Sequence, residues 1–357
     1  CRERSLMLGK RLIQAAAGSA GAAGALDIAI AHGTSPYISV YPWSSGFGTK
    51  YSNPSTLPNG TGTGVAFTPD GSDIAVSHTG NSQPNIAVYP WSSSGFGTKY
   101  SDPSTLPGSL GVYGFGVDFS PDGANIAVAS YSSPYVSVYP WSSSGFGTKY
   151  SDPSSLPGER GNCVAFSPNG NYIAVGQDGG DRMSIYPWSG SGFGTKFTAP
   201  SAKPSGDCAD VAWAPNSDFV AFVHPSNPEV TVYPFSSSGF GAKKGDPSTA
   251  IPDTGNGVAF NHDGSAIAVA HGNSPYVSVY PWSSSGFGSK YSNPSSMLPD
   301  QGQGVAFSPA GDVLAVGHAS SPFVGVYAWS SGFGTKYANP STLPAGSGQF
   351  VAWNSPS

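Results

Sequence analysis

Short apolar runs, separated by turn sequences rich in Gly, Pro, Asn and Asp, follow one another along almost the whole chain. In one representative stretch the runs stand at 258–260, 266–270, 276–282 and 287–291. A four-residue turn sequence ending in Gly264 separates the first two. The third alternates apolar and polar positions with the period of two that is typical of a β-strand. The pattern predicts four short antiparallel strands joined by tight turns.

This four-strand pattern occurs in seven copies, each with the motif Tyr-Pro-Trp-Ser-Ser-Ser-Gly-Phe-Gly-Thr-Lys-Tyr or a close variant. Successive copies lie 47 to 50 residues apart. A repeat of that length with four strands is typical of a propeller blade, which must pack against its neighbours to bury its faces. We therefore predict an all-β fold, a seven-bladed β-propeller with four antiparallel strands per blade. The first tyrosine of the motif stands at Tyr41, Tyr89, Tyr139, Tyr186, Tyr233, Tyr280 and Tyr327.

The two ends of the chain predict how the ring closes. Residues 26–32 have the pattern of a second strand with no first strand before it, and residues 350–356 that of a lone first strand. We expect the C-terminal strand to pair with the three N-terminal strands and complete one blade. Residues 25–357 are assigned to the propeller and residues 1–24 to a partly flexible leader. The apolar run of the leader is too short and interrupted for a secretory signal.

Composition and charge exclude several classes of function. Charged residues make up 10% of the chain, and the net charge is −5 with no basic stripe, which argues against a nucleic-acid partner. No apolar run approaches the roughly 20 residues of a membrane-spanning helix. The three cysteines, Cys1, Cys163 and Cys208, cannot form a disulfide framework. We expect Cys163 and Cys208 to be buried, unpaired thiols, and we expect no metal or other cofactor.

The sequence Phe-Ser-Pro-Asp-Gly at 119–123, followed by apolar runs at 126–128 and 136–139, resembles the WD-repeat family and related bacterial propellers. The resemblance covers residues 26–353 and implies the propeller fold. The family's Gly-His pair is absent, and Tyr-Pro stands where the family has Trp-Asp. The family's role as a peptide scaffold is therefore not carried over.

The leader sequence from Met7 to Gln14, and the near-identical repeats themselves, resemble proteins of tailed bacteriophages of aquatic bacteria. This resemblance implies a place on a virion or another extracellular surface. The partners it implies are other virion or surface proteins and host glycans.

Five copies place a histidine at the end of the second strand. These residues could form a polar ring at one mouth of the central channel, or each could hydrogen-bond the backbone of its own turn. A shared metal ion is disfavoured, because packed sheets lie about 10 Å apart while zinc–nitrogen bonds are about 2 Å long. The histidines are His32, His78, His224, His271 and His318.

The segments that link one blade to the next vary most among the copies. In an antiparallel blade these linkers share a face with the turns between the second and third strands, and therefore with the histidines. Because binding residues tend to lie on loops held by a rigid scaffold, we expect ligand recognition on this linker face. The candidate residues are Tyr113, Phe115, Glu159 and Arg160, together with the five histidines. The repeated Trp and Phe of the motif could stack on sugar rings, but packing between blades explains them better.

Catalytic chemistry has little support in these patterns. The turn acids Asp70, Asp122 and Asp263 lie in separate copies and are better explained as turn formers. We therefore expect no enzyme, but a non-catalytic binding or structural module that presents a rigid disc to a host glycan or a neighbouring structural protein. The alternatives are a lactonase-like propeller hydrolase of small molecules and an intracellular scaffold for protein assembly. The sequence does not indicate the oligomeric state.

Overall fold

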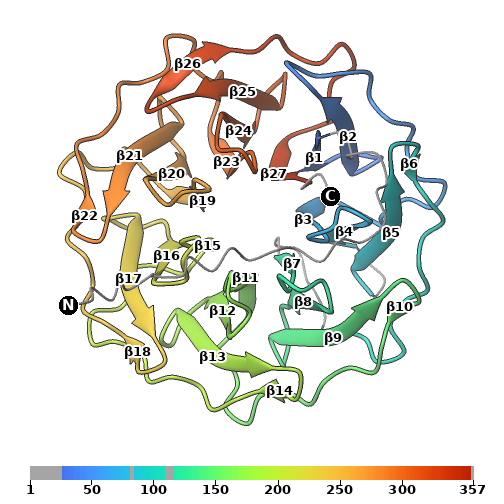
Figure 1. Cartoon of the computed structure of the whole chain (residues 1–357), viewed down its shortest axis with the longest axis vertical. Helices are drawn as coiled ribbons and strands as arrows, with labels where there is room; N and C mark the ends of the chain where they lie inside the picture. The colour runs from blue at the N-terminus through green and yellow to red at the C-terminus, as the bar shows by residue number, and fades with distance from the viewer. Residues whose placement is uncertain (1–25, 81–83, 109–115, 355–357) are drawn as a thin grey trace, which may run out of the picture.

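Seven blades surround a central axis in the computed structural model, which describes residues 26–80, 84–108 and 116–354 (Figure 1). Each blade is an antiparallel sheet; in six blades the strands run in sequence order from the axis outward, and in the closing blade the last strand of the chain lies innermost, followed by the first two. Six sheets have four strands and the seventh has three, and every described regular element is a strand. The predicted fold class is confirmed. The leader and residue 25 lie outside the described residues.

The strands fall into four classes by their distance from the axis. The innermost are β27 (Gly348–Trp353), β3 (Gly62–Phe67), β7 (Val117–Phe119), β11 (Gly161–Phe166), β15 (Asp210–Trp213), β19 (Gly255–Phe260) and β23 (Gly302–Phe307). The second are β1 (Leu26–His32), β4 (Asp73–His78), β8 (Asn125–Ala129), β12 (Tyr172–Gln177), β16 (Phe219–Val223), β20 (Ala266–His271) and β24 (Val313–His318). The third are β2 (Ile38–Trp43), β5 (Ile86–Ser92), β9 (Val136–Ser142), β13 (Met183–Ser189), β17 (Val230–Ser236), β21 (Val277–Ser283) and β25 (Val324–Trp329). The outermost are β6 (Gly95–Phe96), β10 (Gly145–Phe146), β14 (Gly192–Phe193), β18 (Gly239–Phe240), β22 (Gly286–Phe287) and β26 (Phe333–Lys336).

The ring closes by pairing its two ends, as predicted. Strand β27 lies beside β1, with Ile28 opposite Trp353. Two further hydrogen bonds join the ends: Asp27 N donates to Asn354 Oδ1 at 2.6 Å, and Asn354 Nδ2 donates to Asp27 Oδ2 at 2.9 Å. In this blade the outermost pairing is reduced to a single bridge between Trp43 and Phe47. Closure leaves no open blade at either end of the array.

The outermost strands are shorter than the sequence pattern predicts, because the motif proline interrupts the ladder. Pro281 accepts a hydrogen bond from Gly288 N at 2.8 Å, but it has no N–H to donate toward the outer strand. Strand β22 consequently ends at Phe287. The blade formed by β23 to β26 is a natural comparison, because Ala328 replaces the proline there and its outer strand, β26, is the longest of the six.

The motif tyrosines fasten each blade to the linker that leads into it. All seven are fully buried, and each hydroxyl donates to a linker carbonyl; Tyr280 reaches Thr249 O at 2.8 Å. The motif Trp and Phe rings meet edge to face, as in Trp282 and Phe287 with ring centroids 4.9 Å apart. The six motif tryptophans are only 5–6% exposed, so they pack between blades and leave no open face on which a sugar ring could stack.

A candidate active site in the central channel

A cavity of about 330 Å³ lies at the centre of the ring, and all seven innermost strands contribute residues to its wall. Most of its lining consists of Val, Ala, Gly and Phe. The other described lining residues are two carboxylic acids, Asp118 of β7 and Asp210 of β15, together with Cys163 and Trp353. A volume of this size is at the lower end of those that hold small-molecule ligands.

Both acids depart from the repeat at positions where the other copies are apolar. Asp118 is the middle residue of a Val-X-Phe run, and Asp210 directly precedes the equivalent valine, Val211. The two positions lie on one face of the strand, two residues or about 7 Å apart along it, in blades separated by one other. Alanine replaces Asp118 in the other copies, at Ala66, Ala165, Ala212, Ala259, Ala306 and Ala352. The residues at the position of Asp210 are Gly64, Gly116, Cys163, Gly257, Gly304 and Phe350.

Each carboxylate is oriented by backbone N–H groups of its own strand and of the next blade. Asp118 Oδ2 accepts a hydrogen bond from Phe166 N at 2.8 Å. Asp210 Oδ1 accepts one from Val211 N at 2.8 Å, and its Oδ2 one from Val258 N at 3.0 Å. Backbone N–H groups of the innermost strands therefore hold both carboxyl groups in the channel wall.

Burial raises the pKa of Asp118 to about 7 and that of Asp210 to about 7, although the backbone N–H donors partly oppose the rise. Desolvation disfavours the ionised form more strongly than these hydrogen bonds favour it. Near neutral pH, each acid is therefore present in both protonated and ionised forms. This is the condition in which a carboxyl group serves best as a general acid or base.

A second cavity of about 300 Å³ adjoins the first and shares Gly116, Cys163 and Phe350 with it. We call it the mouth cavity. It lies on the linker face, since Arg160, a linker residue, belongs to its lining. Five other polar residues of its lining occupy one equivalent position of the repeat, two before the valine of the innermost strand, where the fifth blade has Ala209; we call these five the polar ring. They are Thr63, Asn162, Asn256, Gln303 and Gln349.

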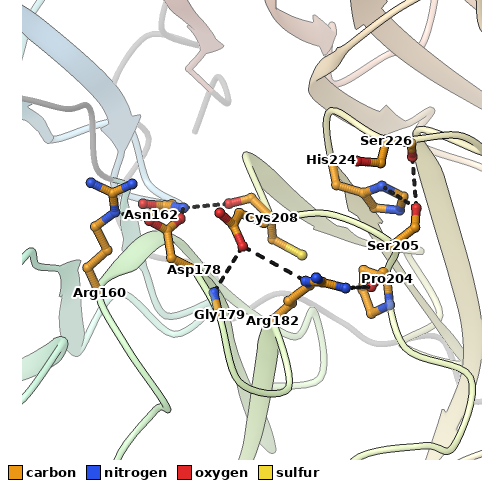
Figure 2. A network of polar contacts seen from close by, with 11 residues as sticks. Arg160, Asn162, Asp178, Gly179, Arg182, Pro204, Ser205, Cys208, His224 and Ser226 are labelled. Atoms are coloured by element: carbon orange, nitrogen blue, oxygen red, sulfur yellow. Dashed lines mark hydrogen bonds and ion pairs between the residues drawn. The ribbon is translucent and has the colours of Figure 1, made fainter.

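Charged residues concentrate beside this mouth, in the fourth and fifth blades (Figure 2). Arg160 Nε forms an ion pair with Asp178, whose Oδ1 also accepts a hydrogen bond from Asn162 Nδ2 at 2.5 Å. The guanidinium group of Arg160 also lies over the Tyr131 ring, 5.6 Å from its centroid. Arg182 donates to Pro204 O at 2.7 Å and fixes the neighbouring turn. These ion pairs and hydrogen bonds thus connect the linker and the turns beside the mouth cavity.

The structure places the sequence-predicted site residues in three different settings. Arg160 lines the mouth cavity, and Glu159 is exposed beside Gly179. Asp178 N donates to Arg160 O at 3.1 Å, which confirms that linkers and second-to-third turns share a face. Tyr113 and Phe115 lie outside the described residues.

The five histidines lie inside the blades instead of at the mouth, with 0–3% of each side chain exposed. His271 Nε2 is 2.9 Å from Ser278 Oγ on the neighbouring strand, and His224 Nε2 is 2.8 Å from Thr231 Oγ1. Burial lowers the pKa of all five to about 4, so they are neutral at ordinary pH. They are not part of the site proposed below.

The repeat pattern does not point to the two channel acids, because neither belongs to what the seven copies share. The available signal was the opposite one: an aspartate at a position where six other copies have alanine. Such a difference inside a near-perfect repeat has no local structural cause, because the same strand forms with either residue.

The predicted thiols are confirmed. Cys163 and Cys208 are both unpaired and buried, and burial raises the pKa of both above the usual range for cysteine. Among the described residues, no group of three or more His, Cys, Asp or Glu side chains could hold a metal ion. The same residues include no helix long and apolar enough to cross a membrane.

Comparisons with known proteins agree with the fold. The family WD domain, G-beta repeat matches residues 154–183. A search of curated proteins finds no match. A candidate 6-phosphogluconolactonase from Bacteroides uniformis ATCC 8492 is similar with a TM-score of 0.69 and 15% identity, over 92% of this chain and 99% of that one.

Two further solved structures are similar to nearly the same extent. A candidate 6-phosphogluconolactonase from Bacteroides fragilis NCTC 9343 has a TM-score of 0.70 and 12% identity, over 94% of this chain and 99% of that one. The periplasmic gluconolactonase of Pseudomonas aeruginosa has a TM-score of 0.64 and 16% identity, over 93% of this chain and all of that one, 100%. Identities this low establish the shared fold alone.

These findings correct two expectations. The expectations of a non-catalytic virion or surface module and of no enzyme are corrected, because the similar structures are named as lactonases and favour the alternative of a lactonase-like propeller. The resemblance to phage propellers finds no support in the comparisons. What the repeat match and the seven sheets together establish is that the chain is a WD-repeat-like seven-bladed β-propeller.

Proposed function

We propose that the chain is a hydrolase that opens a small lactone inside the central channel. The observation that carries this proposal is the presence of Asp118 and Asp210 in one axial cavity, each with a pKa raised to about 7. Paired titratable groups in a concave, mostly apolar site are the usual signature of acid–base catalysis. The lactonase names of the similar structures support the same class of reaction.

The reaction needs one base and one acid. Asp118 is partly exposed to the channel and serves as the base, whereas Asp210 is 5% exposed and serves as the acid. Ionised Asp118 takes a proton from water as the water oxygen bonds to the lactone carbonyl carbon. The bond from that carbon to the ring oxygen then breaks, and the ring oxygen takes the proton of Asp210. The product is the open hydroxy acid. Asp118 passes its proton to solvent and Asp210 regains one.

The test is the rate of acid release from D-glucono-1,5-lactone in a pH-stat, after subtraction of spontaneous opening. Asp118→Ala and Asp210→Asn should each lower kcat by about 10²–10⁴-fold, the usual contribution of a general acid or base. Asp118→Ala installs the residue of the six other copies, so the fold should persist. Asp263→Asn is the matched control, because Asn169 occupies the equivalent turn position. Wild-type protein that does not exceed the spontaneous rate would refute the proposal.

A further inference from the structure

The polar ring of the mouth cavity offers mainly hydrogen-bond acceptors to a ligand. Asn256 Nδ2 donates to Gly302 O at 2.8 Å, and Gln349 Nε2 donates to Ser347 Oγ at 3.0 Å. Asn162 Nδ2 donates to both Asp178 Oδ1 and Cys208 O. Much of the donor capacity of these amides is therefore spent within the protein. Their oxygens remain able to accept hydrogen bonds from ligand hydroxyl groups.

The positive charge at the mouth cavity, that of Arg160, is neutralised by a carboxylate of the protein. Arg160 is the one basic residue among the described residues that line the two cavities. Its Nε pairs with Asp178, which is 8% exposed, and its guanidinium group lies over Tyr131. Glu159 adds a further negative charge next to it in the chain. The local balance of charge along the channel is therefore negative.

A phosphate group fits this lining poorly. At neutral pH a phosphate monoester carries close to two negative charges and presents acceptor oxygens almost exclusively. Such oxygens would meet the amide oxygens and the carboxylates of the channel without enough donors. A dianion beside Asp118 and Asp210 would also favour their protonated forms, which would remove the base that the reaction needs.

We infer that the channel takes a neutral, polyhydroxylated lactone and discriminates against its phosphorylated counterpart, with the amide ring as the recognition element and the Arg160–Asp178 pair as the element that excludes phosphate. This inference rests on the proposed function and specifies its substrate class. It differs from what the names of two similar structures imply for those proteins.

The experiment compares D-glucono-1,5-lactone with its 6-phosphate in kcat/KM. We expect the neutral lactone to be preferred by about tenfold or more, since one like charge about 12 Å away at an effective dielectric near 20 changes affinity by about tenfold. Asp178→Asn, which leaves Arg160 without its anionic partner, should narrow this preference by about tenfold. Asp181→Asn is the matched control: Asp181 belongs to the same turn and pairs with Lys203 at 2.6 Å, but neither residue lines the two cavities, so the preference should stay unchanged.

Binding of two unreactive polyols, D-glucitol and D-glucitol 6-phosphate, is measured in parallel by calorimetry. Tighter binding of glucitol supports the inference whether or not catalysis is observed. Equal or tighter binding of the phosphate ester, or an equal or higher kcat/KM for the phosphorylated lactone, overturns the inference. A preference that is unchanged in Asp178→Asn also overturns it. Glucitol binding without any lactone opening leaves the inference standing and refutes the proposed hydrolase.

Discussion

Replacing Asp118 with alanine should remove catalysis and, above about pH 6, stabilise the fold. The acid is the single departure from alanine among seven equivalent positions. Alanine in the other six innermost strands shows that the strand forms without the carboxyl group. The substitution therefore separates the role of the acid from the role of the strand.

The sign and size of the effect follow from the pKa of Asp118, which is about 7 in the folded chain and has an ordinary value of 3.8. Between these values the folded state binds more protons than the unfolded state, so the free energy of unfolding falls as pH rises from about 4 to about 7. Full burial would correspond to about 4 kcal/mol at the alkaline end. Because Asp118 is partly exposed to the channel, screening reduces this, and we expect about 1–2 kcal/mol.

Thermal unfolding of wild type and Asp118→Ala at pH 5, 6.5 and 8 measures this difference. The advantage of the variant should be smallest at pH 5 and grow toward pH 8. Asp263→Asn is the control, because the Ser265 N–H lowers the pKa of Asp263 below its ordinary 3.8; its contribution is complete by pH 5, so the difference from wild type should stay constant over this range. If the difference for Asp118→Ala were constant with pH, or if the variant lost most stability at pH 8, the desolvated acid described here would be refuted.

Three further predictions concern the scaffold. Pro281→Ala supplies the backbone N–H that the proline lacks and should extend the outer strand. Hydrogen–deuterium exchange at the backbone amides of residues 288–291 should then be slower than in wild type; unchanged exchange would contradict the role given to the proline. Tyr280→Phe removes the bond to Thr249 O but keeps the ring, and should lower the unfolding free energy by about 1 kcal/mol in urea titration; an unaffected midpoint would contradict it. Burial lowers the pKa of His271 to about 4, so the free energy of unfolding falls as pH drops from 6.5 to 4. His271→Gln, which installs the residue found at Gln177, removes this dependence. On going from pH 7.5 to pH 5, the variant should therefore gain about 2 kcal/mol of unfolding free energy relative to wild type. An equal gain at both pH values would contradict a buried neutral histidine.

The architecture could be predicted because all seven copies of the repeat have the same pattern of strands and turns. Local turn chemistry, strand alternation and the complementary chain ends agree on seven blades, and Ile28 lies opposite Trp353 as that logic requires. The outer strands are shorter than predicted. The run from Phe287 to Tyr291 has the pattern of a strand, but Pro281 on the neighbouring strand has no N–H group to donate to it.

The site was hidden for a physical reason. In a run such as Val117-Asp118-Phe119, alternation shows that the middle residue faces away from its neighbours, but it does not show whether that direction is a blade interface or the channel. The histidines show the reverse case: a polar residue at a strand end is compatible with the channel mouth or with its own turn, and the structure buries it because the second strand is covered on both sides by its neighbours.

The pH dependence of kcat/KM for D-glucono-1,5-lactone tests the central claim most directly. One carboxyl group must be ionised and the other protonated, and burial raises the pKa of each to about 7. We predict a bell-shaped profile with its maximum close to neutrality, in which Asp118→Ala abolishes the catalysed rate. A rate that rises steadily with pH, in parallel with spontaneous opening, would contradict the account.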